Sequence, residues 1–163
     1  MRKFCRLVLF LAVPFAFLAG ALPAPAHDYK KGPLHIDHPW SRATPQGATV
    51  AAGYLVIENR GAEAERLITV SVPAEFAGRA EIHEMAVVDG VMRMRPLPRG
   101  IEIAPGMTAK FEPGGLHFMF VDIKRPLTRG DRFKSTLVFE RAGMVEVEFA
   151  VEAMGSGGHH HGH

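Results

Sequence analysis

RAEIHEMAVV-DG-VMRMRPL, residues 79–97, is the stretch that decides the fold. Apolar and polar side chains alternate along both arms, and the dipeptide Asp89-Gly90 lies between them. Asp-Gly between two alternating runs favours a two-residue turn whose twist matches that of the flanking strands. The stretch therefore predicts a β-hairpin with strands at 79–88 and 91–97.

Similar short runs cover the chain on both sides of this hairpin. No stretch keeps an apolar period of 3.6 residues over three turns, so helices are not expected. Turn residues bound the runs, for example Pro113-Gly114-Gly115 and Ala142-Gly143. Many short strands at this spacing indicate an all-β sandwich or barrel with Greek-key connections and a single core. The predicted strands are 34–40, 49–58, 66–72, 79–88, 91–97, 107–112, 116–122, 132–140 and 144–153.

Two His-x-Met triplets carry the clearest chemical signal, one at 83–85 in the hairpin and one at 117–119. Because side chains alternate between the faces of a strand, the histidine and the methionine of each triplet share a face. Phe118 then points into the opposite, apolar face. Imidazole nitrogen and thioether sulfur together form a soft, thiolate-free ligand set, which suits Cu(I) better than Zn²⁺, Fe or Mg²⁺.

Met94 lies between the two triplets and shares a face with Met92 just after the hairpin turn. Ligands from three strands converge if the strand at 116–122 lies near this hairpin. Pro113-Gly114-Gly115 places the second triplet at the start of a strand, close to a loop. A metal site at such an open end of a sandwich is reachable by a partner protein.

A purely structural role competes with this hypothesis, because a methionine on a strand usually fills the core. We interpret Met92, Met107 and Met144 in that way, as core or surface residues. Glu81 and Glu84 are interpreted as solvated charges. If the His and Met pattern were accidental, replacing Met94 or Met119 by isoleucine would leave the Cu(I) affinity unchanged.

The first 26 residues are predicted to be a secretory signal peptide. A basic start is followed by an apolar run over residues 7–22, and Ala24-Pro25-Ala26 provides an A-x-A cleavage signal. The run is shorter than the roughly 20 residues of a membrane-spanning helix and is broken by Pro14. Cys5 precedes the apolar run, so it leaves with the signal and is not a lipid attachment point. A periplasmic protein without stable membrane insertion is expected.

The remaining chain, residues 27–163, is nearly neutral. The signal removes three basic residues and no acidic one, which leaves 16 basic and 17 acidic residues. This balance argues against nucleic acid or a polybasic membrane surface as partner. The chain from residue 27 to residue 163 contains no cysteine, which excludes disulfides and a blue-copper site. No catalytic motif is present, so an enzyme is not expected, although His27 at the new terminus leaves a copper oxygenase as an alternative.

The C-terminal residues 155–163 form a low-complexity Gly- and His-rich tail, expected to be flexible. Imidazoles bind Cu(II), Ni(II) and Zn(II), and Cu(II) is favoured among them. The tail therefore predicts a secondary Cu(II) site beside the core domain at 27–154, unless it is an artificial purification tag. Its candidate ligands are Met154, His159, His160, His161 and His163.

The chain resembles the periplasmic copper chaperones called PCuAC. In that pattern ten residues separate a His from a Met, as His83 and Met94 are separated here, and a His-x-Met triplet follows, here after 22 residues. The segments HPWSRA at 38–43 and AAGYLVIEN at 51–59 are also similar to the family, and the likeness covers roughly 34–153. It implies a cupredoxin-like Greek-key β-sandwich. It also implies the Cu(I) ligands His83, Met94, His117 and Met119, with Met85 only secondary.

The resemblance further implies a Cu(I) carrier whose recipient is the copper centre of a respiratory cytochrome c oxidase, together with Sco-type thioredoxin-like proteins. Copper storage or detoxification in the periplasm is the alternative. Storage predicts more copper per chain and no transfer to an oxidase subunit.

Overall fold

The computed structural model describes residues 28–153, which form eleven strands and no helix. No helix within that range is therefore available to cross a membrane. The strands are β1 (Asp28–Lys31), β2 (Leu34–Arg42), β3 (Val50–Asn59), β4 (Glu65–Ser71), β5 (Arg79–Val88), β6 (Val91–Pro96), β7 (Ile101–Ile103), β8 (Thr108–Phe111), β9 (Leu116–Val121), β10 (Arg132–Phe139) and β11 (Gly143–Glu152).

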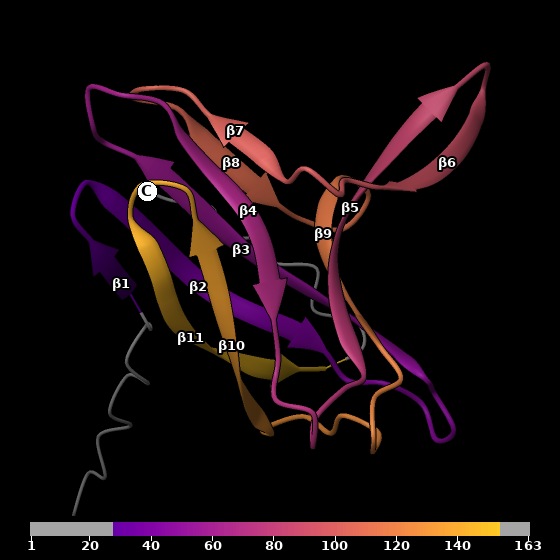
Figure 1. Ribbon diagram of the computed structural model, residues 1–163. Helices are drawn as coiled ribbons and strands as arrows, with labels where there is room; N and C mark the ends of the chain where they lie inside the picture. Colours follow the sequence, from indigo (N-terminus) through magenta and orange to yellow (C-terminus); the bar gives the residue numbers. More distant parts are fainter. Residues whose placement is uncertain (1–27, 154–163) are drawn as a thin grey trace, which may run out of the picture.

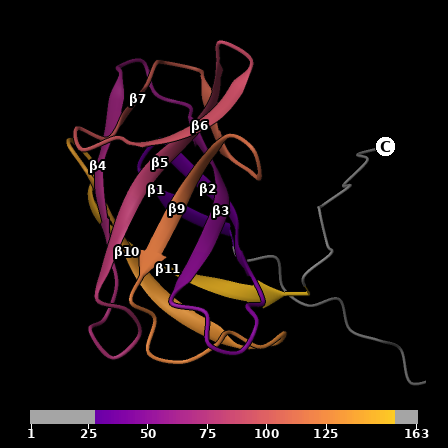
Figure 2. The same cartoon turned by 90° about the vertical axis from the view of Figure 1, so that its right-hand side faces the viewer.

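The strands form one continuous path that wraps around the core (Figures 1 and 2). Its order is β6-β5-β9-β8-β3-β2-β11-β10-β4-β7, with β1 paired to β2 and β9 also paired to β3. Most neighbours are antiparallel, but β2 runs parallel to β11 and β8 runs parallel to β9. The pairing of β2 with β11 joins two halves of the sandwich. One half contains β3, β5 and β9, and the other contains β4, β10 and β11. The all-β sandwich predicted from the sequence is confirmed.

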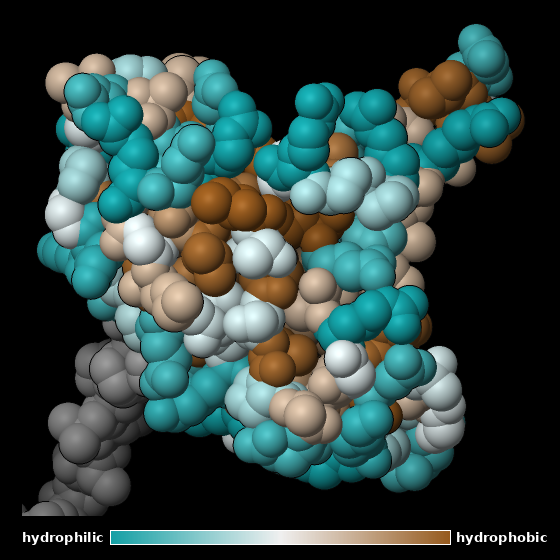
Figure 3. All heavy atoms as spheres, in the orientation of Figure 1, coloured by the Kyte–Doolittle hydropathy of each residue, from teal (hydrophilic) through white to brown (hydrophobic). Residues whose placement is uncertain are grey.

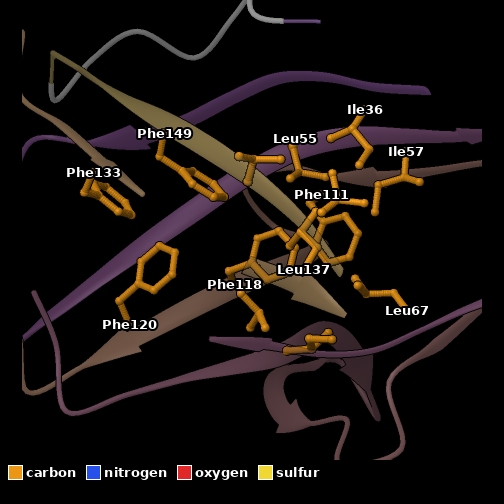
Figure 4. Close-up of a cluster of buried hydrophobic side chains, with 14 of the residues drawn as sticks. Ile36, Leu55, Ile57, Leu67, Phe111, Phe118, Phe120, Phe133, Leu137 and Phe149 are labelled. Carbon is orange, nitrogen blue, oxygen red and sulfur yellow. The ribbon is translucent and has the colours of Figure 1, made fainter. Parts of the chain in front are cut away.

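Aromatic side chains fill the space between the two halves (Figure 4). The ring of Phe120 on β9 lies with its centroid 5.1 Å from that of Phe133 on β10 and 5.6 Å from that of Phe149 on β11. Phe118 stacks on Phe111 at 4.4 Å, and both Phe118 and Phe120 are fully buried. Each such side chain contributes about 1.5–3 kcal/mol by leaving water. This anchoring fixes which face of β9 points outward.

All nine predicted strands are present, and no end differs from the prediction by more than two residues. The sequence missed β1 and β7. β1 reads DYKK and has no apolar alternation, and it forms by pairing with β2. β7 has only three residues, between Gly100 and Pro105, and forms by pairing with β4. Both strands depend on a partner and not on their own pattern.

The hairpin of β5 and β6 projects from the body of the sandwich (Figure 1). Its two strands pair in register from His83 opposite Pro96 to Val88 opposite Val91. Asp89 and Gly90 both have positive φ angles, 53° and 77°, as the predicted two-residue turn requires. β6 lies at the end of the strand order, so one edge of this hairpin is not paired with another described strand.

Candidate metal centre

The two histidines of the His-x-Met triplets lie opposite each other on neighbouring strands. His83 on β5 pairs with His117 on β9, and the next pair along is Ile82 with Phe118. Because Ile82 and Phe118 point into the core, the histidines point away from it. Both are nevertheless buried, with 7% of their surface exposed, and their ring centroids are 5.8 Å apart.

Met94 brings a sulfur atom to this pair from the hairpin. Its Sδ lies 3.2 Å from Nε2 of His117. Met94 is 49% exposed, whereas the imidazole that its sulfur contacts is buried. The predicted convergence of the hairpin and the strand at 116–122 is therefore observed, since β5 pairs directly with both β6 and β9.

The ring of His117 is oriented by the backbone. Its Nδ1 lies 3.0 Å from the carbonyl oxygen of Gly115, to which an Nδ1–H donates. In the neutral ring this leaves the lone pair on Nε2, the nitrogen that faces the Met94 sulfur. A hydrogen bond of this kind to a backbone carbonyl is the usual way in which proteins orient a metal-binding histidine. Nε2 of His117 is therefore available as a ligand.

The ring of His83 is held by Glu81, which shares its face of β5. Nε2 of His83 lies 2.7 Å from Oε2 of Glu81, and Arg79 donates to the other carboxylate oxygen at 2.7 Å. The hydrogen bonds from His83 and then from Arg79 hold the pKa of Glu81 below its ordinary value. An ionised Glu81 can only accept, so Nε2 of His83 carries the proton.

This leaves Nδ1 of His83 as a buried nitrogen with no hydrogen-bond partner among residues 28–153. Such an unpaired buried polar atom is costly unless something binds to it. A metal ion is a suitable partner for this lone pair. The interpretation of Glu81 as a solvated charge missed this contact, because the carboxylate is 34% exposed but also accepts from His83. The signal that could have found it was the two-residue spacing of Glu81 and His83, which puts both on one face of a strand.

The structure describes two of the other predicted ligands, Met119 and Met85. Met119 lies two residues after His117 on the same face of β9, half-buried, between Glu81 on β5 and Ala52 on β3. Met85 is half-buried and pairs with Met94 across the hairpin. The predicted signal peptide 1–26 and the predicted ligands of the tail lie outside the described residues. Those predicted ligands are Met154, His159, His160, His161 and His163.

A second group of ligating side chains lies on β1 and β2. Atoms of Asp28, His35 and Asp37 come within 4.8 Å of one another. Arg60 donates to Nε2 of His35 at 3.1 Å and so already provides a positive charge beside the two carboxylates. Burial and the nearby Asp28 raise the pKa of Asp37. This group has oxygen donors and resembles an ordinary surface ion network more than a soft-metal site.

Comparison with known proteins agrees with the geometry. The family model described as "Putative lipoprotein LpqE-like" matches residues 34–151. The apo PCuAC domain from PmoF1 is 35% identical, with a TM-score of 0.63, and the alignment covers 78% of this chain and 99% of that domain. The copper-bound PCuAC domain from PmoF2 is 34% identical over 78% of this chain and 98% of that domain, also with a TM-score of 0.63.

The chain belongs to the LpqE-like, or PCuAC, family. A relative from Leifsonia xyli subsp. xyli, named "Putative lipoprotein Lxx21020", is 28% identical over 119 residues, 73% of this chain and 69% of the relative. The solution structure of apo-DR1885 from Deinococcus radiodurans is 20% identical and has a TM-score of 0.54, covering 92% of this chain and all of that one. That likeness concerns the fold alone. The fold of this PCuAC protein is thus the cupredoxin-like β-sandwich that the sequence predicted.

Proposed function

We propose that this protein is a periplasmic Cu(I)-binding metallochaperone. The observation that carries the proposal is the meeting of Nε2 of His117 with Sδ of Met94 at 3.2 Å, beside the unpartnered Nδ1 of His83. Met119, the fourth proposed ligand, lies on the same face of β9 as His117. Two imidazoles and two thioethers are neutral ligands, so the bound ion keeps its single positive charge. This set favours Cu(I) over the harder divalent ions.

The exposure of the ligands supports a carrier over a protein with a permanent cofactor. Met94 is half exposed on a projecting hairpin, while the two histidines are buried behind it. No thiolate holds the ion, so a partner that offers cysteine sulfur competes well for it. A relative of this chain was solved as a copper-bound PCuAC domain, which supports copper as the cargo. No catalytic role is proposed.

Export to the periplasm is supported by the basic and apolar start of the chain and by relatives that are named lipoproteins. Cys5 precedes the apolar run, and residues 27–163 contain no cysteine to carry a lipid. We therefore propose signal cleavage after Ala26 and release of the mature chain into the periplasm.

The proposed recipient is the copper centre of a respiratory cytochrome c oxidase, reached directly or through a Sco-type thioredoxin-like protein. This part of the proposal rests on the family resemblance. The His-rich tail is proposed to capture Cu(II) before its reduction, since several imidazoles on one segment favour Cu(II). Deleting residues 155–163 should then remove the weaker Cu(II) binding and leave Cu(I) binding intact.

X-ray absorption on the Cu(I)-loaded protein tests the core site. A mixed shell of nitrogen and sulfur is expected, and Met94→Leu should remove one sulfur. Met107→Leu is the matched control, because Met107 is also exposed, at 58%, but lies outside the site. A shell of nitrogen and oxygen only in the unsubstituted protein would overturn the proposal. Loss of copper to a purified oxidase subunit separates a carrier from a storage protein, which would retain it.

A further inference from the structure

The β5–β6 hairpin has two chemically different faces. Successive cross-strand pairs alternate between them. One face carries the pairs Met85–Met94 and Val87–Met92, which continue outward from His83. The other face carries the ion pair of Glu84 with Arg95, at 2.6 Å, and Arg93 opposite Ala86. Figure 3 shows hydrophobic atoms among hydrophilic ones on this projecting part of the molecule.

Of the three methionines on the first face, Met85 is half-buried, and the other two have no packing role that explains them. Met92 is 58% exposed and Met94 is 49% exposed, so neither fills the core. Methionine is not among the residues that strands favour, so β-propensity does not explain them either. Met92 was interpreted from the sequence as core or surface, and the structure places it on the surface. What the three share is a thioether on one side of one hairpin.

Their register brings these thioethers within reach of a single ion. Directly opposed residues such as Met85 and Met94 have Cβ atoms about 4.5–5.5 Å apart, and diagonal neighbours such as Met85 and Met92 are about 7–8 Å apart. Methionine has three rotatable side-chain bonds, so the sulfurs can converge across these separations. Thioether ligands select Cu(I) over harder ions.

We propose that Met85, Met92 and Met94 form a second, weaker Cu(I) site through which the ion passes on its way to and from the histidines. This inference rests on the proposed function of the core site. Met94 belongs to both sites, since its sulfur already contacts His117. Transfer is then a ligand exchange: a bond from copper to a hairpin sulfur breaks as a bond to an imidazole nitrogen forms. Copper stays Cu(I) throughout, and no electron or proton is exchanged.

The position of this site suits transfer to another protein. Met92 lies two residues beyond Met94 towards the turn, about 7 Å farther along the strand. A partner can therefore contact the outer sulfur without reaching the buried histidines. The thioether site is weaker than the core site because it lacks imidazole ligands, and this difference draws the ion inward when no competing partner is present.

Nuclear magnetic resonance of the purified protein, labelled with ¹³C at the methionine ε-methyl groups, tests the proposal. Cu(I) is diamagnetic, so the methyl resonance of each ligating methionine shifts when the ion is added without oxygen. In the His83→Ala/His117→Ala variant, Cu(I) should shift Met85, Met92 and Met94 together. Adding Met92→Leu to that variant should weaken the residual binding at least tenfold. Adding Met107→Leu instead, at a residue of the same exposure, should leave it unchanged.

Two results would overturn the inference. One is that the Met85 and Met92 resonances stay in place; the other is that those of Met107 and Met144 shift as strongly. If the histidine variant fails to fold, the same titration of the unsubstituted protein provides the test. The methyl resonances of Met85 and Met92 must shift or broaden once Cu(I) exceeds one equivalent. The resonances of Met107 and Met144 must stay unchanged. The first equivalent tests the core site separately, because it should shift Met94 and Met119. Absence of that shift would instead refute the proposed function.

Discussion

Replacing Glu81 by alanine removes the acceptor that holds the ring of His83 in place. Nε2 of His83 lies 2.7 Å from the Glu81 carboxylate, and this contact leaves Nδ1 as the free nitrogen. Without it the imidazole can rotate and can place its proton on either nitrogen. Only one orientation and tautomer of the His83 imidazole can bind Cu(I) at this site. Because the free protein then populates several, the affinity for Cu(I) falls.

The size of the loss follows from the geometry. A hydrogen bond to a charged group contributes about 1.5–3 kcal/mol. The Glu81 side chain is 34% exposed, so water competes for it and the lower end of this range applies. Since about 1.4 kcal/mol corresponds to a factor of ten, we expect Glu81→Ala to weaken Cu(I) binding about tenfold. Measured costs of removing such supporting partners are about 10–100-fold.

Anaerobic competition with a chromophoric Cu(I) chelator measures this loss. Glu84→Ala is the matched control, because Glu84 lies on the same strand, is 33% exposed and is paired with Arg95 on the other face. Glu81→Gln keeps an acceptor oxygen and should fall between the unsubstituted protein and Glu81→Ala. Long-range ¹H–¹⁵N correlation spectra should show His83 bound through Nδ1. Equal affinities of the two alanine variants, or binding through Nε2 of His83, would refute the reasoning.

Three further predictions concern the site and its scaffold. Met119→Leu should lower Cu(I) affinity at least tenfold and reduce the sulfur count by one in X-ray absorption, with little change in unfolding temperature, since the two side chains have similar volumes. Gly53→Ala should lower the free energy of unfolding in denaturant by about 1–3 kcal/mol, because the added Cβ would lie 2.7 Å from Cε2 of Phe120. Asp131→Asn should cost about 1 kcal/mol at neutral pH, because the Thr128 amide and then the Arg125 guanidinium hold the pKa of Asp131 below its ordinary value of 3.8. A lowered pKa stabilises the folded state above the ordinary value, so this difference should shrink as the pH falls below 3.8 and disappear once the pH lies below the lowered pKa, as thermal unfolding at several pH values would show.

Local sequence patterns predicted the strands well because each pattern reflects a local constraint. Asp89-Gly90 supplies the positive φ angles that a two-residue turn requires, and both residues have them. The alternation around Phe118 and Phe120 fixed which face of β9 is buried, and hence where His117 points. The strand β1 was missed because its stability comes from pairing with β2, which no local pattern records.

The sequence by itself determined the ligand types, their faces and the all-β fold, because side-chain alternation and turn chemistry are local properties of the chain. The pairing of β5 with β6 was predicted as a hairpin, but only the tertiary structure decided that β5 also pairs with β9, which brings His83, Met94 and His117 together from three strands. It also decided which ring nitrogens are free, because Glu81 and the Gly115 carbonyl occupy the others. Strand pairing and hydrogen bonding join residues that are distant in sequence, and such choices depend on the packing of the whole sandwich.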